Sequence, residues 1–257
     1  MELIKSAAKR SKLSDVVYIA LNLVLAALVL GLTLMFTPPY MAYLIVLLSK
    51  WRVFAVRPRF WLANIQTNLV DTLVGLSVVT LIWQASGALL IQLLLTILYA
   101  GWLLMIKPRS KRIFILAQAG ISQLVAMIAL FSMSHLVDAS LIVLACWVIG
   151  YVSARHILDN YDEEDTTLLS MAWGLFVAEI GWLSNHWMTA YQLSGNLLLP
   201  QGAMIVTLAG YVAWRLYDAI HHHNLSWGRV RAHVLFAVVV IGILLLKELS
   251  EIFRITS

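Results

Sequence analysis

The side chain with the clearest chemical potential is a carboxyl group, Glu179, deep inside the apolar segment Met171–Trp187. On insertion scales a charged group at the bilayer centre costs roughly 2.5–3.5 kcal/mol, so such a residue usually marks a site. Trp182 and His186 follow at helical spacing and share its face. The pattern predicts that Glu179 and His186 relay a proton or bind a cation. The alternative is a protonated Glu179 hydrogen-bonded between helices, with His186 as an interfacial anchor.

A second polar stripe recurs at helical spacing near the start of another apolar segment. It consists of Asn64, Asn68, Asp71 and Gly75. Arg57 and Arg59 come just before it and are near enough in sequence to pair with Asp71, since a carboxylate in lipid needs a partner. Two functions are open: the arginines hold a phosphate head group, or Asp71 and Asn68 pass an ion. The structural alternative is an internal salt bridge that fixes the helix end.

A third group combines imidazole and carboxylate ligands in one polar loop. Asp218, His221 and His222 have the i, i+3 and i+4 spacing that can bind a divalent metal. Membrane di-iron enzymes use several such boxes, whereas this chain contains one. A solvated, weakly basic loop is therefore the alternative to a metal site.

The elements that must position these groups are long apolar segments. They are continuous rather than alternating, which indicates helices and not the strands of a membrane barrel. The sequence predicts a single all-α transmembrane domain over 1–257, with about nine spans. The predicted spans lie near 16–36, 38–56, 68–83, 88–106, 113–132, 137–153, 168–185, 200–217 and 232–246. The segment 38–56 is the weakest because it contains Lys50 and Arg52, and without it eight spans remain.

Charge placement favours nine spans with a cytoplasmic N-terminus. In that topology every Lys and Arg except Lys247 and Arg254 falls on the cytoplasmic side. The loops near Pro38, Ser86 and Gly195 contain no Lys or Arg. This asymmetry follows the positive-inside rule.

The amino-acid composition also indicates a membrane protein. The 257 residues are 61% hydrophobic and only 12% charged, which is far too apolar for a water-soluble fold. The net charge of +5 does not indicate nucleic acid, because most bases flank apolar segments, where they attract anionic lipid head groups. The predicted partners are therefore the bilayer and its head groups, together with other membrane subunits.

Two stretches carry a resemblance to a known family. Leu48–Trp61, LSKWRVFAVRPRFW, and Val177–Trp187, VAEIGWLSNHW, resemble segments of uncharacterised polytopic membrane proteins of Saccharibacteria and related candidate bacterial phyla. The resemblance implies a bacterial cytoplasmic membrane and brings no catalytic residues, cofactor or substrate.

Three functions remain open on the sequence. The first is a transporter or channel-like protein that handles a proton or cation through Glu179, with His186 and Asp71. The second is a membrane-embedded enzyme or binder of a lipid-linked phosphate, with Arg57 and Arg59 at the head group. The third is a non-catalytic subunit of a membrane complex. The sequence shows no phosphate-binding glycine loop or hydrolase motif, and it leaves the cofactor unknown.

Overall fold

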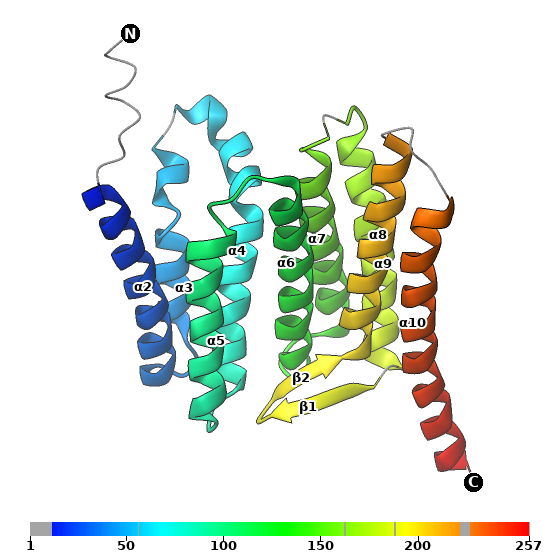
Figure 1. The fold of residues 1–257 in the computed structure, drawn as a ribbon. Coiled ribbons are helices and arrows are strands. Elements are labelled where there is room, and N and C mark those ends of the chain that lie inside the picture. The colour runs from blue at the N-terminus through cyan, green and yellow to red at the C-terminus, as the bar shows by residue number, and fades with distance from the viewer. Residues whose placement is uncertain (1–11, 56, 162, 188, 222–226, 257) are drawn as a thin grey trace.

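The chain folds into a bundle of roughly parallel and antiparallel helices, shown by a computed structural model (Figure 1). The structure describes residues 12–256 except 56, 162, 188 and 222–226, with the backbone alone at 12, 13, 52, 227–230 and 247–256. The α-helices are α2 (Lys12–Met35), α3 (Tyr40–Leu48), α4 (Trp61–Gln84), α5 (Leu89–Gly101), α6 (Arg112–Ser132), α7 (Ala139–Leu158), α8 (Thr166–His186), α9 (Gln201–His221) and α10 (Trp227–Thr256). Two short 3-10 helices, η1 (Trp51–Phe54) and η2 (Pro58–Phe60), precede α4.

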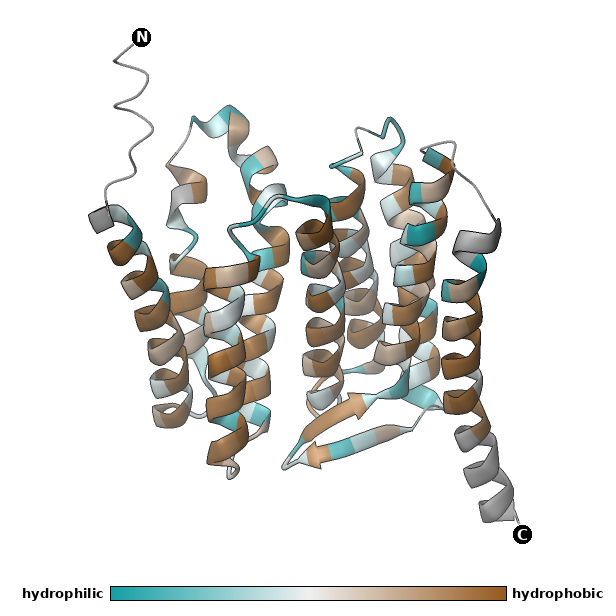
Figure 2. Ribbon diagram, in the orientation of Figure 1, coloured by the Kyte–Doolittle hydropathy of each residue, from teal (hydrophilic) through white to brown (hydrophobic). Residues whose placement is uncertain are grey.

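Among the residues that the structure describes, six helices are long and apolar enough to cross a membrane, which supports a multi-pass membrane protein. These segments are Ser14–Met35, Pro58–Gln84, Leu89–Ile106, Arg112–Ser132, Ala139–Leu158 and Thr166–His186. A shorter apolar helix segment covers Arg231–Leu246. Figure 2 shows apolar residues along the middle of the bundle and polar residues mainly in the loops at one end.

The predicted span at 38–56 is not one continuous helix. Its α-helical part, α3, has nine residues and is followed by a turn and by η1. At 1.5 Å per residue α3 is about 14 Å long, roughly half the hydrocarbon thickness of a bilayer. The helix ends where the charged Lys50 enters the protein interior, so α3 is a half-length element rather than a full crossing.

Helix α8 lies against α7 along a face of small residues. A Cβ atom added at Gly174 would come within 2.8 Å of the Trp147 carbonyl oxygen of α7, and one at Gly150 within 2.8 Å of Val177. Such small residues let two helix backbones approach closely in a membrane. The stripe that includes Gly174 and Ala178 is therefore a packing face.

A β-hairpin, which was not predicted from the sequence, joins α8 to α9. Strands β1 (Ala190–Ser194) and β2 (Leu197–Pro200) are antiparallel, with Gly195 at a positive φ of 54° in the turn. The Asn196 backbone N–H donates to the Gln84 carbonyl, and the Leu198 N–H donates to the Ser132 hydroxyl. The hairpin thus covers the ends of α4 and α6.

The loops divide by charge between the two ends of the bundle. The connections 49–60 and 107–111, which carry Lys and Arg, lie at one end, which we call the basic face, at the top of Figure 1. The acidic connection 159–165 lies at the same end. The turns 36–39, 85–88 and 133–138 and the hairpin lie at the other end and contain no Lys or Arg. Short α3 still returns the chain to the basic face, so the predicted separation of charge survives its reduced length.

Candidate functional site

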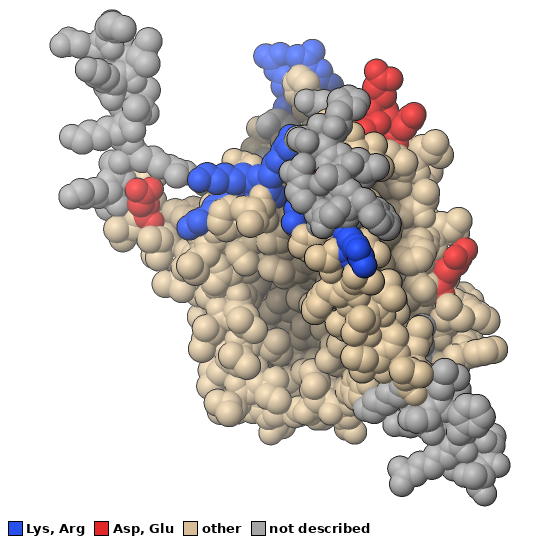
Figure 3. Space-filling model, turned by 45° about the vertical axis from the view of Figure 1, so that its right-hand side comes forward, with Lys and Arg blue, Asp and Glu red and all other residues tan. Residues whose placement is uncertain are grey.

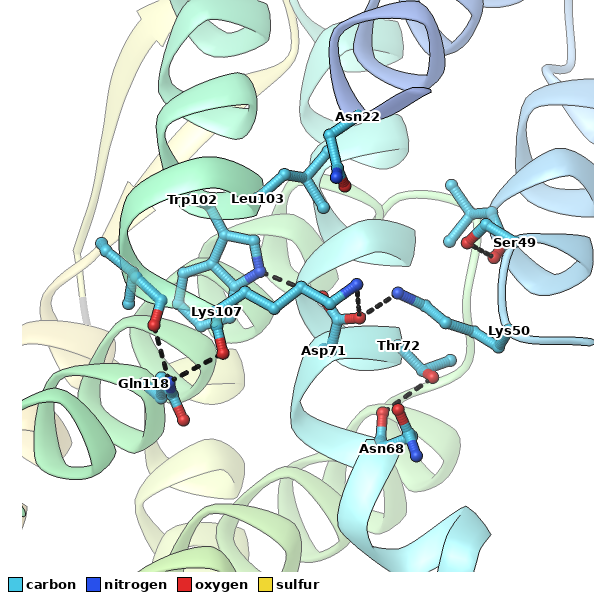
Figure 4. Close-up of polar contacts among 12 residues, drawn as sticks. Asn22, Ser49, Lys50, Asn68, Asp71, Thr72, Trp102, Leu103, Lys107 and Gln118 are labelled. Carbon is cyan, nitrogen blue, oxygen red and sulfur yellow. Dashed lines mark hydrogen bonds and ion pairs between the residues drawn. The ribbon is translucent and has the colours of Figure 1, made fainter. Parts of the chain in front are cut away.

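Asp71 of α4 lies at the centre of a buried group of charges (Figure 4). Its Oδ2 atom is paired with the ammonium groups of Lys50 and Lys107, the latter at 2.7 Å. Its Oδ1 atom accepts a hydrogen bond from the Trp102 indole N–H at 3.1 Å. Asp71 and Lys50 are only 8% and 9% exposed. Two cations share one carboxylate, so with all three groups ionised the cluster carries a net positive charge.

Close helix packing brings the first lysine to Asp71. Gly75, one turn further along α4, faces α3: an added Cβ would meet the Val46 side chain at 2.6 Å. Only a residue without a Cβ therefore lets α3 approach α4 here. Lys50 follows two residues after the end of α3, and its side chain reaches Asp71 from that position (Figure 4).

A π-helical turn places the other two partners. Helix α5 continues as η3 (Trp102–Ile106), whose wider turn is closed by the bond from the Lys107 N–H to the Trp102 carbonyl. The Tyr18 hydroxyl donates to the Leu103 carbonyl, and the Gln118 side chain donates to the carbonyl of Ile106. Such single π turns are frequent at functional sites. Here the turn sets Trp102 and Lys107 on the same carboxylate.

The partners of Asp71 are lysines rather than the arginines that the sequence suggested. Arg57 and Arg59 are exposed, and the Arg59 guanidinium lies over the Phe60 ring at 4.6 Å. The Asn68 side chain donates to the Asn64 carbonyl one turn earlier, at 2.8 Å, and no hydrogen bond joins it to Asp71 in Figure 4. Besides the carboxyl group of Asp71 itself, the apolar context of Lys50 was a sequence signal for this cluster, since a lysine in an apolar segment needs a counter-charge.

Glu179 lies on the outward face of α8. It is exposed, and no hydrogen bond or ion pair joins it to any residue that the structure describes. Its neighbours on this face, Phe176 and Trp182, are 36% and 44% exposed. The His186 ring stacks on Trp182, with 4.7 Å between the ring centroids, and its Nδ1 lies 2.8 Å from the Trp182 carbonyl oxygen. His186 is thus held at the helix end and not by Glu179.

The predicted metal ligands on α9 belong, where described, to an aromatic cluster. The Tyr161 hydroxyl donates to Asp218 at 2.8 Å and accepts from the Trp214 indole N–H at 2.9 Å. Burial raises the pKa of Tyr161, and the bond to Asp218 acts in the same direction, so this phenol keeps its proton. The His221 ring contacts the Tyr161 ring edge-on at 5.2 Å.

A metal site on α9 is not formed by the described residues. Among them no group of three His, Cys, Asp or Glu side chains is placed to hold a metal ion. His222 lies outside the residues that the structure describes, so a site that includes it stays a prediction.

A cavity of about 430 Å³ lies between α6, α7, α8 and α9. Its wall is overwhelmingly apolar and includes Gly120 of α6, Trp173 of α8, and Gly210, Tyr211 and Trp214 of α9. The sequence did not predict this cavity, because its wall is formed by four helices that are separate in the sequence. Figure 3 shows the molecule hollowed on this side, below a group of Lys and Arg side chains.

Polar side chains in the cavity wall bond to other groups of the protein. The Trp173 indole N–H donates to the Gln123 side-chain oxygen at 3.0 Å, and the Thr207 hydroxyl donates to the Ala203 carbonyl. A wall whose polar groups are already paired offers mainly dispersion contacts and the removal of apolar surface from water. The cavity is therefore suited to an apolar ligand and is unsuited to a hydrated ion.

Comparison of the chain with protein-family models, with curated proteins and with solved structures finds no match. The likeness to membrane proteins of Saccharibacteria thus stays a prediction from the two short stretches Leu48–Trp61 and Val177–Trp187.

Proposed function

We propose that this protein binds an amphipathic lipid, with the apolar part in the cavity between α6 and α9 and the polar head toward the basic face. The observation that carries the proposal is the cavity itself, which is about 430 Å³ and almost wholly apolar. Ligand sites in proteins are typically concave, of this size and apolar, with few polar groups that fix orientation. Because the cavity lies within a helical membrane bundle, lipid is the apolar ligand in greatest supply.

The proposed topology has eight full crossings and one half-length element. The crossings are the six apolar helices together with α9 and α10, while α3 enters part of the way. The basic face then lies in the cytoplasm, as the positive-inside rule requires. If the Saccharibacteria likeness holds, this membrane is the bacterial cytoplasmic membrane.

The test fills the cavity without disturbing its wall. A Cβ atom added at Gly120 meets nothing within 4 Å, so Gly120→Phe places a ring in the open space. Gly31→Phe is the matched control, because an added Cβ on α2 also meets nothing and Gly31 lies outside the cavity. The full chain is purified in polymer discs of native membrane, and co-purified lipid is quantified by mass spectrometry.

Gly120→Phe is expected to lower the bound lipid about tenfold or more, equivalent to about 1.4 kcal/mol, while Gly31→Phe retains it. Equal lipid content in the wild-type protein and Gly120→Phe would overturn the proposal.

A second candidate function, a subunit of a larger membrane assembly, is favoured by Glu179. A carboxyl group on the outward face of an apolar helix, without a partner among the described residues, fits a contact with another membrane protein. Crosslinking in the membrane from a reactive residue at Phe176, followed by mass determination, tests it. Recovery of the uncrosslinked chain alone counts against this role. The proton or cation pathway through Glu179 stays a prediction, since the cavity does not include this residue.

A further inference from the structure

We propose that the head group of the bound lipid is a phosphate, held by Arg215 where α9 meets α10. The inference rests on the proposed lipid function and names the chemical class of the head. Arg215 was not singled out by its sequence, which places it in a helix with no motif. Its significance comes from the contacts that join it to the cavity wall.

A short chain of contacts leads from the cavity to this arginine. Tyr211 and Trp214 line the cavity. The Arg215 guanidinium lies 5.4 Å from the centroid of the Trp214 ring, and its Nη2 is 2.8 Å from Nε2 of His233 on α10. The other ring nitrogen of His233, Nδ1, is 3.1 Å from the Tyr211 hydroxyl oxygen. Arg215 therefore lies behind the cavity wall, in contact with the lining residue Trp214.

The hydrogen bonds fix the direction of each proton. A guanidinium can only donate, so Nε2 of His233 is the acceptor and the imidazole is neutral with its proton on Nδ1. This Nδ1–H donates to the Tyr211 oxygen. The hydroxyl proton of Tyr211 is then left to donate to another acceptor beside the cavity, which suits an oxygen-rich head group.

The charge of Arg215 is not balanced within the described structure. No Asp or Glu among the described residues lies within ion-pair distance of it, and its buried Nε–H has no hydrogen-bond acceptor. The carboxylate one turn further along, Asp218, is taken by Tyr161 and lies 3.7 Å from Arg112. A buried donor without an acceptor destabilises a protein, and more so when it belongs to a charged group.

A phosphate supplies what this site lacks. Its oxygens accept from guanidinium Nη–H groups that His233 does not take, and its negative charge balances the cation, whereas the enclosed Nε–H is not one of the groups it reaches. The aromatic ring of Trp214 and the neutral His233 hold the fork in place. An acyl chain in the cavity and a phosphate at Arg215 would lie next to each other. A single phospholipid can therefore occupy both sites.

The test compares two lipids that differ only in the phosphate. Binding of phosphatidic acid, and of diacylglycerol with the same chains, to the full chain in neutral discs is measured by native mass spectrometry. Arg215→Gln removes the charge, and Arg215→Lys keeps it without the fork. Arg109→Gln is the matched control, since Arg109 also stacks on an aromatic ring, at 4.6 Å, on the basic face.

Arg215→Gln is expected to weaken phosphatidic acid binding about tenfold to hundredfold, as for lost hydrogen bonds between charged groups, with Arg215→Lys intermediate. Diacylglycerol binding should be unchanged in every arginine variant, which also shows that each variant is folded. Wild-type affinity for phosphatidic acid in Arg215→Gln would overturn the proposal. Arg59→Gln is measured in the same way. Loss of phosphatidic acid binding in Arg59→Gln, with none in Arg215→Gln, would also overturn the proposal and would favour the head-group site predicted from the sequence.

Two further outcomes separate this inference from its premise. If Gly120→Phe leaves both lipids bound, the lipid cavity fails whatever Arg215 does. If inorganic phosphate alone binds in an Arg215-dependent manner without displacing phosphatidic acid, the site takes free phosphate and the lipid head-group assignment is wrong.

Discussion

The two carboxyl groups that the sequence places within apolar segments have opposite surroundings. Asp71 is enclosed by two lysines and an indole N–H, whereas Glu179 faces outward without a partner in the described structure. Both residues occupy long apolar helices and both stand beside small residues. A carboxyl group deep in an apolar segment needs its charge to be neutralised. Tertiary packing decides whether the same chain supplies the counter-charge.

The largest change in the free energy of unfolding is expected when Asp71 loses its charge. Asp71→Asn leaves two ammonium groups together without a counter-charge, and we expect a loss of about 3–5 kcal/mol in the free energy of unfolding. The measurement is denaturant unfolding in mixed micelles, with Asp138→Asn, at the exposed start of α7, as the control.

The double variant Asp71→Asn/Lys50→Met should recover part of the loss, because one unpaired cation is removed with its partner. An Asp71→Asn protein as stable as Asp138→Asn would show that the cluster adds nothing to stability.

A smaller effect is expected from the indole that completes the cluster. Trp102→Phe keeps an aromatic ring in a site that is 4% exposed but removes the N–H donor to Asp71. Loss of a hydrogen bond to a charged group costs about 1.5–3 kcal/mol, measured by the same unfolding transition. Trp182→Phe, on the exposed face of α8, is the control and should leave the transition in place. Equal shifts in the two variants would contradict a specific role for the Trp102 N–H.

The smallest effect is expected at the unpartnered carboxyl. Glu179→Gln removes a charge and breaks no contact within the described structure, so the stability of the monomer should be unchanged or slightly higher. Unfolding and the mass of the purified particle are measured together. A lower stability, or a loss of mass, would show that Glu179 is paired across an interface.

The same variant addresses the proton or cation pathway. If Glu179 and His186 carry ions, Glu179→Gln abolishes pH-dependent flux in proteoliposomes. Unchanged flux would remove Glu179 from any such mechanism, and the two carboxyl groups would then differ in structural role alone.

The sequence by itself determined the class of the protein and its polarity across the bundle. Apolar helix lengths and the basic loops on one face are local patterns, because helical periodicity and composition depend on neighbours in the chain. The need of Asp71 for a cationic partner could likewise be predicted. The segment 38–56, for which the sequence left a full crossing open, contains Lys50, which is that partner.

Only the tertiary structure decided which groups meet. The pairing of Lys50 and Lys107 with Asp71, the contacts of the hairpin with α4 and α6, and the cavity all join segments far apart in sequence. The outward position of Glu179 likewise depends on which face of α8 packs against the other helices. Periodicity shows which residues share a helix face but not which face meets another helix, since that depends on close packing between helices.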